Sequence, residues 1–488
     1  MIFSHNPDIL WMLEVVYQTQ CCPTTMPLSY RIKQLTLALG DLLSFGCGFV
    51  LALTIRYWTI PSGVKIQQHT ALFGIVFVLW LLVNYINGLY DLERQATVRG
   101  WYRRFMEAAF MSTVFSVIFF YSIPSRSITP KTILVLSVLF GYGLSALWRI
   151  AFHALLLSEA LLVNVVFVGR TAETNELIDL LFAHPEKGYR VVALIDPTME
   201  GPAENTHSYS VYHELSDIRS ITERHHAQLI IIAPHLRKDT KALQELYQLL
   251  FYPIQVNDLT SFYELLTGRI PPSTFSEGWF LDHLKNTRRP MYERFRGMVD
   301  IVASLVLGTF FLALFPFLAF FIKTTSRGPV LIKQKRAGKN GVVFFLYKFR
   351  SMYALSKDGS AETEGVQFAK KGDTRITPIG KFLRKTRLDE LPQSWNLLRR
   401  DITLIGPRPE RPEIVEKLEA RMPYYPLRHV VRPGLTSWAV LHQNYTDTLE
   451  LSLQKLQYDL YYIKNRSLIL DLSILLRTIN VILRGLGQ

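Results

Sequence analysis

Cysteine and charge are both scarce in this chain of 488 residues. Its three cysteines, Cys21, Cys22 and Cys47, lie near the N-terminus, and the adjacent pair matches no zinc or redox spacing. The pattern therefore favours neither a disulfide framework nor a metal knuckle. Charged residues make up 19% of the chain and hydrophobic residues 49%, which excludes a disordered polymer and argues against an ordinary soluble enzyme. With a net charge of +14, the composition indicates a membrane protein with a basic soluble portion.

Four apolar runs predict transmembrane helices in the first third of the chain. Each is close to the ~20 residues that cross a bilayer. The runs are Leu35–Ile55, Leu72–Leu89, Phe105–Tyr121 and Ile133–Ile150. Between the second and third runs lie four arginines, against two basic residues in each of the other loops, so this loop and both ends of the bundle are expected in the cytoplasm. Buried helices of a large soluble domain are the alternative.

A fifth apolar run, Met298–Ile322, has basic residues on both flanks. Positive charge on both sides favours both ends on one face of the membrane, and Pro316 inside the run removes a backbone hydrogen bond. We expect a re-entrant helix over residues 298–322 that enters the cytoplasmic leaflet, breaks near Phe315-Pro316 and returns. A kinked fifth span is the alternative.

Residues 161–259 alternate strand and helix signals. Apolar runs at Leu161–Val168, Val191–Ile195 and Leu229–Ile232 read as strands, with helices at Ile218–His226 and Leu243–Phe251 between or after them. This alternation predicts a parallel, doubly wound sheet. Only one glycine, Gly169, follows the first strand, so a working dinucleotide site is not expected. The domain is interpreted as structural or regulatory.

Basic residues gather immediately after the fifth run. From Lys323 to Arg411 there are 20 basic and 8 acidic residues. Such a field suits a polyanion: nucleic acid, anionic lipid or a nucleotide diphosphate. Nothing resembles a recognition helix or a stacking platform, so nucleic acid fits poorly. A patch that only holds the domain on anionic lipid is the simpler alternative.

Asp389 and Glu390 stand beside this basic field, at the expected start of a helix through Leu397. Acidic residues there are ordinary helix caps. A carboxylate can also attack phosphorus to form an acyl phosphate, or hold Mg²⁺ that bridges diphosphate oxygens. Arg408, fixed between Pro407 and Pro409, presents a rigid fork suited to phosphate.

From about Tyr292 onward the chain resembles the monotopic polyprenyl-phosphate phosphoglycosyl transferases, the bacterial sugar transferases of exopolysaccharide and O-antigen assembly. The resemblance rests on many ordered blocks rather than on one motif. The blocks are Gly328-Pro329-Val330, Gln334–Gly338, Tyr347–Met352, Leu388–Gln393, Gly406–Glu410, Arg432-Pro433-Gly434, Tyr458–Asn465 and Leu470-Asp471-Leu472. The N-terminal bundle, Thr267–Pro271 and Gly485-Leu486-Gly487 further resemble the large, exopolysaccharide-type members.

The resemblance implies that Asp389 attacks the β-phosphate of a UDP-sugar, releasing UMP, and that undecaprenyl phosphate then takes the phosphosugar. It implies that Asp389 and Glu390 bind Mg²⁺ or, for Glu390, handle a proton. Arg408 would bind phosphate, Asp373 would orient a basic partner, and a further set would neutralise charge: Lys335, Arg336, Arg350 and Arg375. For Lys335 and Arg336 a lipid-facing surface role is the alternative. The implied place is the bacterial inner membrane, with the catalytic domain on the cytoplasmic face and a homodimer as one expectation.

The expected fold is membrane α plus α/β: an N-terminal tail (1–30), a four-span bundle (31–158), a degenerate Rossmann-like domain (159–290) and a catalytic α/β domain with the re-entrant helix (291–488). The tail from Ser467 to Leu486 is expected to lie along the membrane or to pack on the core. Ser437 and Val440 stand where the family usually has glycine and glutamine. That departure motivates an alternative function, a weakened scaffold or regulator of polysaccharide assembly. A conventional glycosyltransferase, which releases UDP, is a third candidate.

Overall fold

The computed structural model describes most of the chain beyond its first 27 residues. The described residues are 28–90, 98–122, 131–156, 162–197, 208–238, 240–249, 252, 254–284, 289–356, 373–443 and 448–483. Most of the predicted N-terminal tail, Cys21-Cys22 and Gly485-Leu486-Gly487 lie outside this set, as does most of Ser356–Gly365, where the sequence also predicts a loop. The chain divides into two compact units, Met1–Thr267 and Gly268–Gln488.

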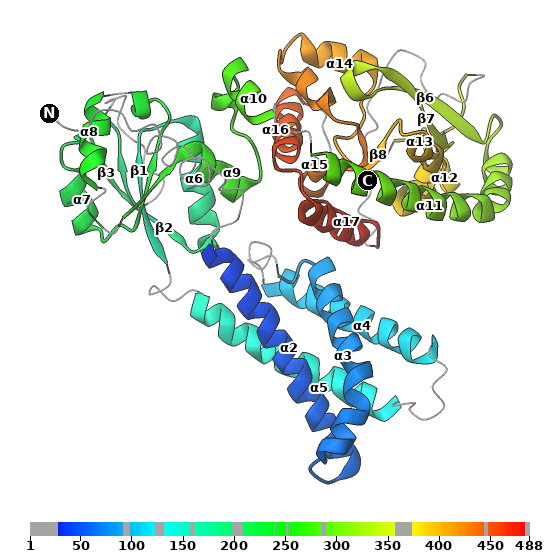
Figure 1. Cartoon of the computed structure of the whole chain (residues 1–488). Coiled ribbons are helices and arrows are strands. Elements are labelled where there is room, and N and C mark those ends of the chain that lie inside the picture. Colours follow the sequence, from blue (N-terminus) through cyan, green and yellow to red (C-terminus); the bar gives the residue numbers. More distant parts are fainter. Residues whose placement is uncertain are drawn as a thin grey trace. The chain divides into compact units, whose positions relative to one another are not determined.

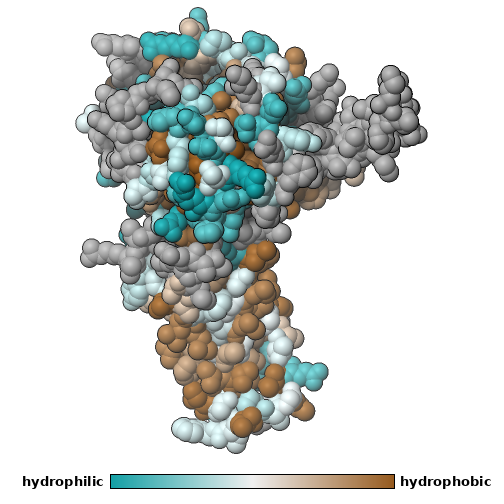
Figure 2. Space-filling view, turned by 90° about the vertical axis from the view of Figure 1, so that its left-hand side faces the viewer, coloured by the Kyte–Doolittle hydropathy of each residue, from teal (hydrophilic) through white to brown (hydrophobic). Residues whose placement is uncertain are grey.

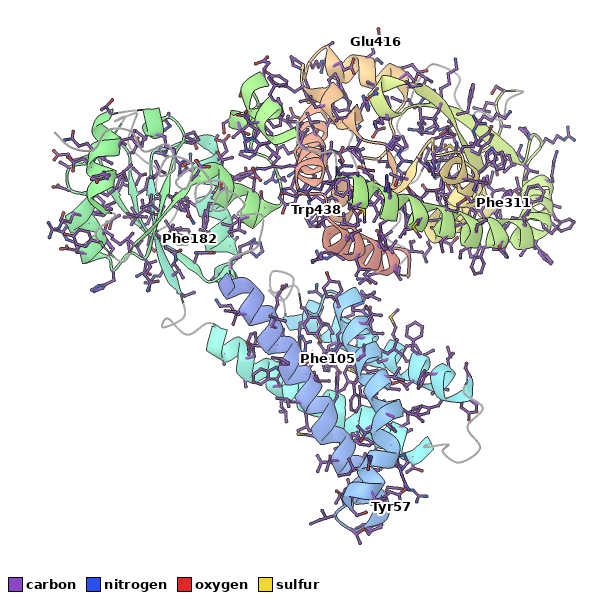
Figure 3. The ribbon with its side chains drawn as sticks, in the orientation of Figure 1. Tyr57, Phe105, Phe182, Phe311, Glu416 and Trp438 are labelled. Atoms are coloured by element: carbon purple, nitrogen blue, oxygen red, sulfur yellow. The ribbon has the colours of Figure 1, made fainter. Side chains whose placement is uncertain are left out.

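Four long helices begin the first unit: α2 (Leu28–Tyr57), α3 (Gly63–Ile86), α4 (Val98–Ser122) and α5 (Lys131–Leu156). All four are long and apolar enough to cross a membrane. Their aromatic core includes Phe45, Trp80 and Phe105, and Phe105 points between the helices (Figure 3). Their outer surface is largely apolar (Figure 2), as lipid contact requires. The helices contain three of the four predicted runs, and α3 covers the fourth, Leu72–Leu89, as far as Ile86.

A polar network lies inside these helices. Asp41 of α2 is fully buried, and its carboxylate accepts hydrogen bonds from Arg149 and Ser145 of α5 and from the Tyr90 hydroxyl. The Arg149 guanidinium also donates to the Leu89 carbonyl at 2.7 Å. Since an unpaired charge is costly away from water, this network binds α2 to α5 and to the segment after α3.

The first unit also holds a parallel sheet (Figure 1), whose five strands pair in the order β3-β2-β1-β4-β5. The strands are β1 (Val163–Val168), β2 (Tyr189–Ile195), β3 (Ser210–Tyr212), β4 (Leu229–Ile232) and β5 (Gln255–Asp258). Helices α6 (Ala172–Ala183) and α9 (Leu259–Thr267) share one core cluster with the sheet, and α7 (Ile218–Arg224) and α8 (Thr240–Gln248) share another. Gly169 has φ +94°, and a Cβ there would lie 2.7 Å from Ala233 Cβ, so the β4 loop fills the space after β1.

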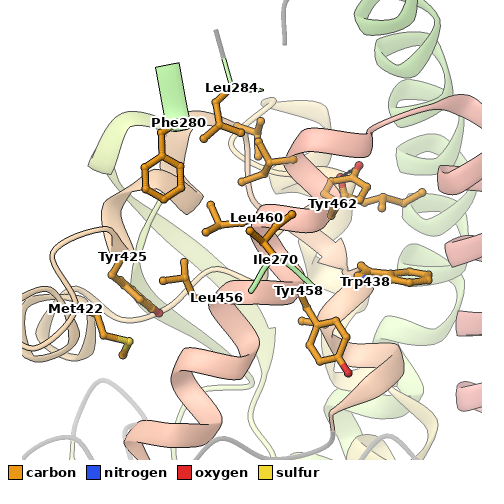
Figure 4. Packing of buried hydrophobic residues seen from close by; sticks show 14 of the residues in the cluster. Ile270, Phe280, Leu284, Met422, Tyr425, Trp438, Leu456, Tyr458, Leu460 and Tyr462 are labelled. Carbon is orange, nitrogen blue, oxygen red and sulfur yellow. Dashed lines mark hydrogen bonds between the residues drawn. The ribbon is translucent and has the colours of Figure 1, made fainter. Parts of the chain in front are cut away.

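The second unit contains one very long helix, two small sheets and several short helices. The helices are α10 (Glu277–Leu284), α11 (Pro290–Thr325), α12 (Pro378–Thr386), α13 (Ser394–Leu398), α14 (Pro412–Glu419), α15 (Trp438–His442), α16 (Leu449–Asn465) and α17 (Leu468–Leu483). Strands β6 (Leu331–Ala337) and β7 (Val343–Phe349) pair antiparallel, and β8 (Thr403–Ile405) and β9 (Gly434–Thr436) pair parallel. The main core gathers on α16 (Figure 4).

Residues 268–284 belong to this second core. Ile270, Phe280 and Leu284 are buried in it (Figure 4). The Ile270 amide donates to the Gln457 carbonyl, and Trp438 Nε1 donates to the Gly268 carbonyl at 2.9 Å. The predicted boundary at residues 290/291 therefore lies about one helix later than the division at Thr267/Gly268. The sequence offered no linker signal there, because Ile270 and Phe280 anchor the segment through contacts distant in sequence.

Helix α11 is continuous from Pro290 to Thr325, with Pro316 inside it. The helix is therefore not interrupted at Phe315-Pro316 as predicted, because a proline removes one hydrogen bond and can bend a helix without ending it. The helix is one of five in the described residues with the length and composition of a membrane span. The tail helix α17 packs Ile474 in the core and exposes Leu468, Ile469 and Leu472, so it has a protein-facing and an apolar outer side.

Candidate active site

The Asp389–Glu390 pair lies on a tight turn between two short helices. Helix α12 ends at Thr386, Arg387 adopts a left-handed conformation with φ 55°, and a 3₁₀ helix, η9 (Leu388–Gln393), follows before α13. The predicted single helix from Asp389 to Leu397 is therefore a 3₁₀ turn joined to a short α-helix. The tighter turn places the two adjacent carboxylates in a packed, buried site instead of leaving them as exposed caps.

Three basic side chains surround Glu390. Arg408 Nη2 lies 3.0 Å from Glu390 Oε1, Lys348 Nζ lies 3.9 Å from the same oxygen, and Arg387 Nη1 lies 3.5 Å from Oε2. Burial alone would raise the pKa of Glu390, but Arg408, Lys348 and Arg387 lower it to about 2. Glu390 is thus ionised at neutral pH and is a poor proton carrier.

Asp389 has a different environment. It is 8% exposed, and its carboxylate makes no hydrogen bond or ion pair with any residue that the structure describes. Burial and the charge of Glu390 raise the pKa of Asp389 to about 6, although Lys348, Arg384 and Arg408 act in the opposite direction. A buried carboxylate without a partner, in a field of positive charge, is suited to attack an electrophilic phosphorus.

Lys348 is a site residue that the sequence prediction missed. It lies on β7, which Asn396 of α13 holds in place: Asn396 Oδ1 accepts from the Tyr347 amide at 3.1 Å, and Nδ2 donates to the Phe345 carbonyl at 2.8 Å. Burial lowers the pKa of Lys348 to about 8, against the opposing effect of Glu390. The alternation of β7 is the signal that could have found it, since Leu346, Lys348 and Arg350 share one face.

Side chains of neighbouring segments hold the backbone of the Arg408 loop in place. The buried Arg428 donates to the Arg408 carbonyl at 2.9 Å and pairs with Asp459 at 2.7 Å. Arg336 donates to the Pro409 carbonyl at 3.1 Å, and Lys455 pairs with Glu410. These contacts fix the backbone on both sides of Arg408, so its guanidinium reaches Glu390 from a rigid loop.

The other predicted phosphate ligands occupy varied places. Lys335 is exposed on β6, while Arg336 on the same strand is partly buried against the Arg408 loop. Asp373 and Arg375 pair with each other, Nη2 to Oδ2 at 2.6 Å, and hydrogen bonding from Arg375 lowers the pKa of Asp373 to about 2. The pair is compatible with the prediction that Asp373 orients a basic partner, which here is Arg375.

Arg350 lies away from the carboxylate pair's direct contacts and is almost fully buried. Its guanidinium donates to the carbonyls of Ser326 at 2.7 Å, Arg327 at 2.8 Å and Ile322 at 3.3 Å, at the C-terminal end of α11. Ser326 and Arg327 follow the last residue of α11, where backbone carbonyls lack intrahelical partners, so Arg350 caps this end of the helix. This position favours a structural role over the predicted contact with phosphate.

A divalent cation would find oxygen ligands at the Asp389–Glu390 turn. In the described residues there is no group of three or more His, Cys, Asp or Glu side chains that could hold a metal by itself. Mg²⁺ typically needs only one or two carboxylates, with waters and substrate phosphates completing its shell. The unpartnered Asp389 carboxylate fits this mode, and Glu390 would have to share its oxygens with the surrounding cations.

Ser437 and Val440, the two departures from the family pattern, form a helix cap. Ser437 Oγ accepts from the Val440 amide at 3.2 Å at the start of α15, with Ser437 in an extended conformation that requires no glycine. The hydroxyl is therefore used structurally, and the backbone is unstrained.

Comparisons with known proteins find similarity in both compact units of the chain. A sequence model described as bacterial sugar transferase matches residues 291–485, and one described as a CoA-binding domain matches residues 85–256. The chain is 40% identical over 240 residues to a UDP-N-acetylgalactosamine-undecaprenyl-phosphate N-acetylgalactosaminephosphotransferase of Aeromonas hydrophila, covering 48% of this chain and 53% of that protein. It therefore spans about half the length of that relative.

Two other relatives are covered more fully. A UDP-glucose:undecaprenyl-phosphate glucose-1-phosphate transferase of Klebsiella pneumoniae is 31% identical over 328 residues, 65% of this chain and 67% of that protein. An exopolysaccharide production protein of Rhizobium leguminosarum bv. phaseoli is 38% identical over 194 residues, 38% of this chain and 93% of that protein. On these matches and the site that they include, the chain is a membrane protein that belongs to the bacterial sugar transferase family.

Proposed function

We propose that the protein transfers a sugar 1-phosphate from a UDP-sugar to undecaprenyl phosphate, releasing UMP, as the first membrane step of exopolysaccharide or O-antigen assembly. The observation that carries the proposal is the contrast inside one turn: Asp389 is buried without a partner, while three cations surround Glu390. The names of relatives that act on UDP-sugars and undecaprenyl phosphate support the substrate classes.

In the first step an Asp389 carboxylate oxygen attacks the β-phosphorus. The bond between that phosphorus and the bridging oxygen breaks, and UMP leaves with the bonding electron pair. The sugar phosphate is now an acyl phosphate on Asp389. In the second step an oxygen of undecaprenyl phosphate attacks the same phosphorus, the bond to Asp389 breaks, and the free carboxylate returns.

The cations supply charge stabilisation in both steps. Arg408, Lys348 and Arg387 already surround a carboxylate, so the same groups can receive the phosphoryl oxygens of the donor. Asp389 and Glu390 would hold Mg²⁺, which when bound would neutralise diphosphate charge. Glu390, ionised at neutral pH, acts through its charge and not by carrying a proton.

The proposed setting is the bacterial inner membrane, with α2–α5 as a four-span bundle and the catalytic unit on the cytoplasmic face. Contacts of α11 support a re-entrant course: Asp300 and Ser304 in its first half and the carbonyls at its C-terminal end all bond to the same compact unit. The parallel sheet order supports a doubly wound domain without a dinucleotide turn.

The test is nucleotide release from the purified full chain in nanodiscs with undecaprenyl phosphate, Mg²⁺ and a panel of UDP-sugars. UMP with one donor, a phosphosugar adduct by intact-protein mass spectrometry, and loss of both in Asp389→Asn are expected. Asp282→Asn, at an exposed position of α10, is the matched control and should retain activity. UDP as product would contradict the proposal in favour of a conventional glycosyltransferase.

A scaffold or regulator of polysaccharide assembly is the second candidate, because Ser437 and Val440 depart from the family pattern. It predicts no UMP from any donor in folded protein, and a polymer defect on deletion that Asp389→Asn does not reproduce. The cap formed by Ser437 gives a structural reason for the departure, which favours the enzyme.

A further inference from the structure

One face of the membrane helix α11 carries polar residues that do not fit lipid. Tyr292, Arg296, Asp300 and Ser304 recur every four residues and are all buried. Residues at this spacing lie along one side of a helix, and polar groups there need partners within the protein. Two of these residues, Asp300 and Ser304, bond to the two segments that build the candidate active site.

Asp300 holds the strand that leads to Arg408. It is 2% exposed, and its Oδ1 accepts from the Leu404 amide at 2.8 Å. The Thr403 hydroxyl donates to both carboxylate oxygens, at 3.0 and 2.8 Å. Strand β8 ends at Ile405, and Gly406-Pro407-Arg408 follows directly, so Asp300 fixes the point from which the Arg408 loop leaves the sheet.

Ser304, one helical turn further along, holds the other segment. Its hydroxyl donates to the Ser394 carbonyl at 2.7 Å. Ser394 directly follows the 3₁₀ helix that carries Asp389 and Glu390. The contact between Arg408 and Glu390 at 3.0 Å then closes a ring of bonds that begins and ends on α11.

Building on the proposed function, we propose that Asp300 and Ser304 are positioning residues of the transfer reaction. They set the separation between the Asp389–Glu390 turn and the Arg408 loop from a helix that the bilayer itself holds. The seating of α11 in the membrane is thereby linked to the geometry of attack. Neither residue is expected to touch the substrate, so their loss should affect turnover more than substrate binding.

Kinetics of variants in nanodiscs test the inference. Asp300→Ala should lower kcat about 100-fold, the cost of a displacement of about 1 Å, with KM for the UDP-sugar within about twofold. Asp300→Asn keeps one oxygen for the Leu404 amide and should restore much of kcat. Thr309→Val is the matched control, since this exposed hydroxyl on the same helix bonds to the Leu305 carbonyl one turn earlier.

A double-mutant cycle separates positioning from general loss of stability. Ser304→Ala and Thr403→Val each release one segment of the same ring, so their effects on kcat should be strongly non-additive. Their effects on melting temperature should be close to additive, because the two contacts are separate. Additive effects on kcat, or an Asp300→Ala kcat within twofold of Thr309→Val at equal folded fraction, would overturn the inference.

Hydrogen exchange tests the same contacts without turnover. In Asp300→Ala the peptide covering residues 402–408 should exchange faster, and in Thr309→Val it should not. Unchanged exchange in Asp300→Ala would overturn the inference, whether or not the protein releases UMP. Absence of UMP release from the unsubstituted protein would instead count against the proposed function alone. If Asp300→Ala does not fold, Asp300→Asn and Thr403→Val provide the kinetic and exchange comparisons.

Discussion

Adjacent carboxyl groups on one turn have opposite tendencies to ionise. Burial and Glu390 raise the pKa of Asp389 to about 6, whereas neighbouring cations outweigh burial and lower the pKa of Glu390 to about 2. An attacking carboxylate must be ionised, so single-turnover UMP release should fall as pH decreases through about 6, approaching tenfold per unit. Glu390→Gln removes the neighbouring charge and should move this fall in rate to lower pH. A pH–rate profile that is unchanged in that variant would contradict the assignment of Asp389 as the nucleophile.

Arg350 offers a second prediction at the residue scale. Because its guanidinium caps α11 through three carbonyls, Arg350→Ala should lower the free energy of unfolding by about 3 kcal/mol, in denaturation of the full chain in detergent. Gly328→Ala should destabilise similarly, since its φ is +126° and a Cβ would lie 2.1 Å from Arg350 Nη1. In folded Arg350→Lys the KM for the UDP-sugar should change little; a large rise would restore Arg350 as a phosphate ligand.

At the scale of elements, the sequence predicted regular segments better than the turn that matters most. The strand expected at Leu229–Ile232 is β4, and the helix expected at Ile218–His226 is α7, which ends two residues earlier. The left-handed Arg387 and the 3₁₀ turn after it leave no periodic signal, because a single residue changes the direction of the chain. Lys348 was missed since Phe345, Tyr347 and Phe349 make β7 resemble a uniformly apolar strand.

The start of α15 bears on the departure from the family pattern. Ser437 caps this helix, and replacing a capping serine with glycine costs only a few tenths of a kcal/mol. Ser437→Gly should therefore leave kcat within about twofold and lower the melting temperature slightly. A large gain in UMP release in Ser437→Gly with Val440→Gln would instead show that these positions restrain catalysis.

The buried network in the helices α2–α5 permits a stability prediction. Asp41→Asn removes the charge that balances Arg149 and leaves the guanidinium buried without a counter-ion, at a cost of about 3 to 5 kcal/mol. Thermal unfolding in detergent should show a clear loss for Asp41→Asn. Thr54→Val on the same helix is the control, because this exposed hydroxyl bonds to the Val50 carbonyl of its own helix. Equal melting of the two variants would mean that the network contributes little.

At the scale of the whole molecule, the course of α11 decides how a soluble donor and a membrane acceptor meet. A straight helix of 36 residues would extend about 54 Å, well beyond ~30 Å of hydrocarbon. Yet Ser304, in the first half of the helix, bonds to Ser394, and Arg350 caps the C-terminal end of the helix. Both contacts lie within the second compact unit. A folded unit stays on one side of a bilayer, so the two ends of α11 are expected on the same side.

Cysteine labelling tests this topology directly. In a chain whose three cysteines are replaced by serine, single cysteines at the exposed positions Arg294 and Lys323 mark the two flanks of α11. A membrane-impermeant maleimide should label neither in intact spheroplasts and both in inverted vesicles. A cysteine at Thr59, in the loop between α2 and α3, should show the reverse, because an even number of spans returns both ends of the bundle to the cytoplasm. Labelling of Lys323→Cys from the same side as Thr59→Cys would establish a fifth span. It would then require that the contacts of Arg350 with the end of α11 do not form in the membrane.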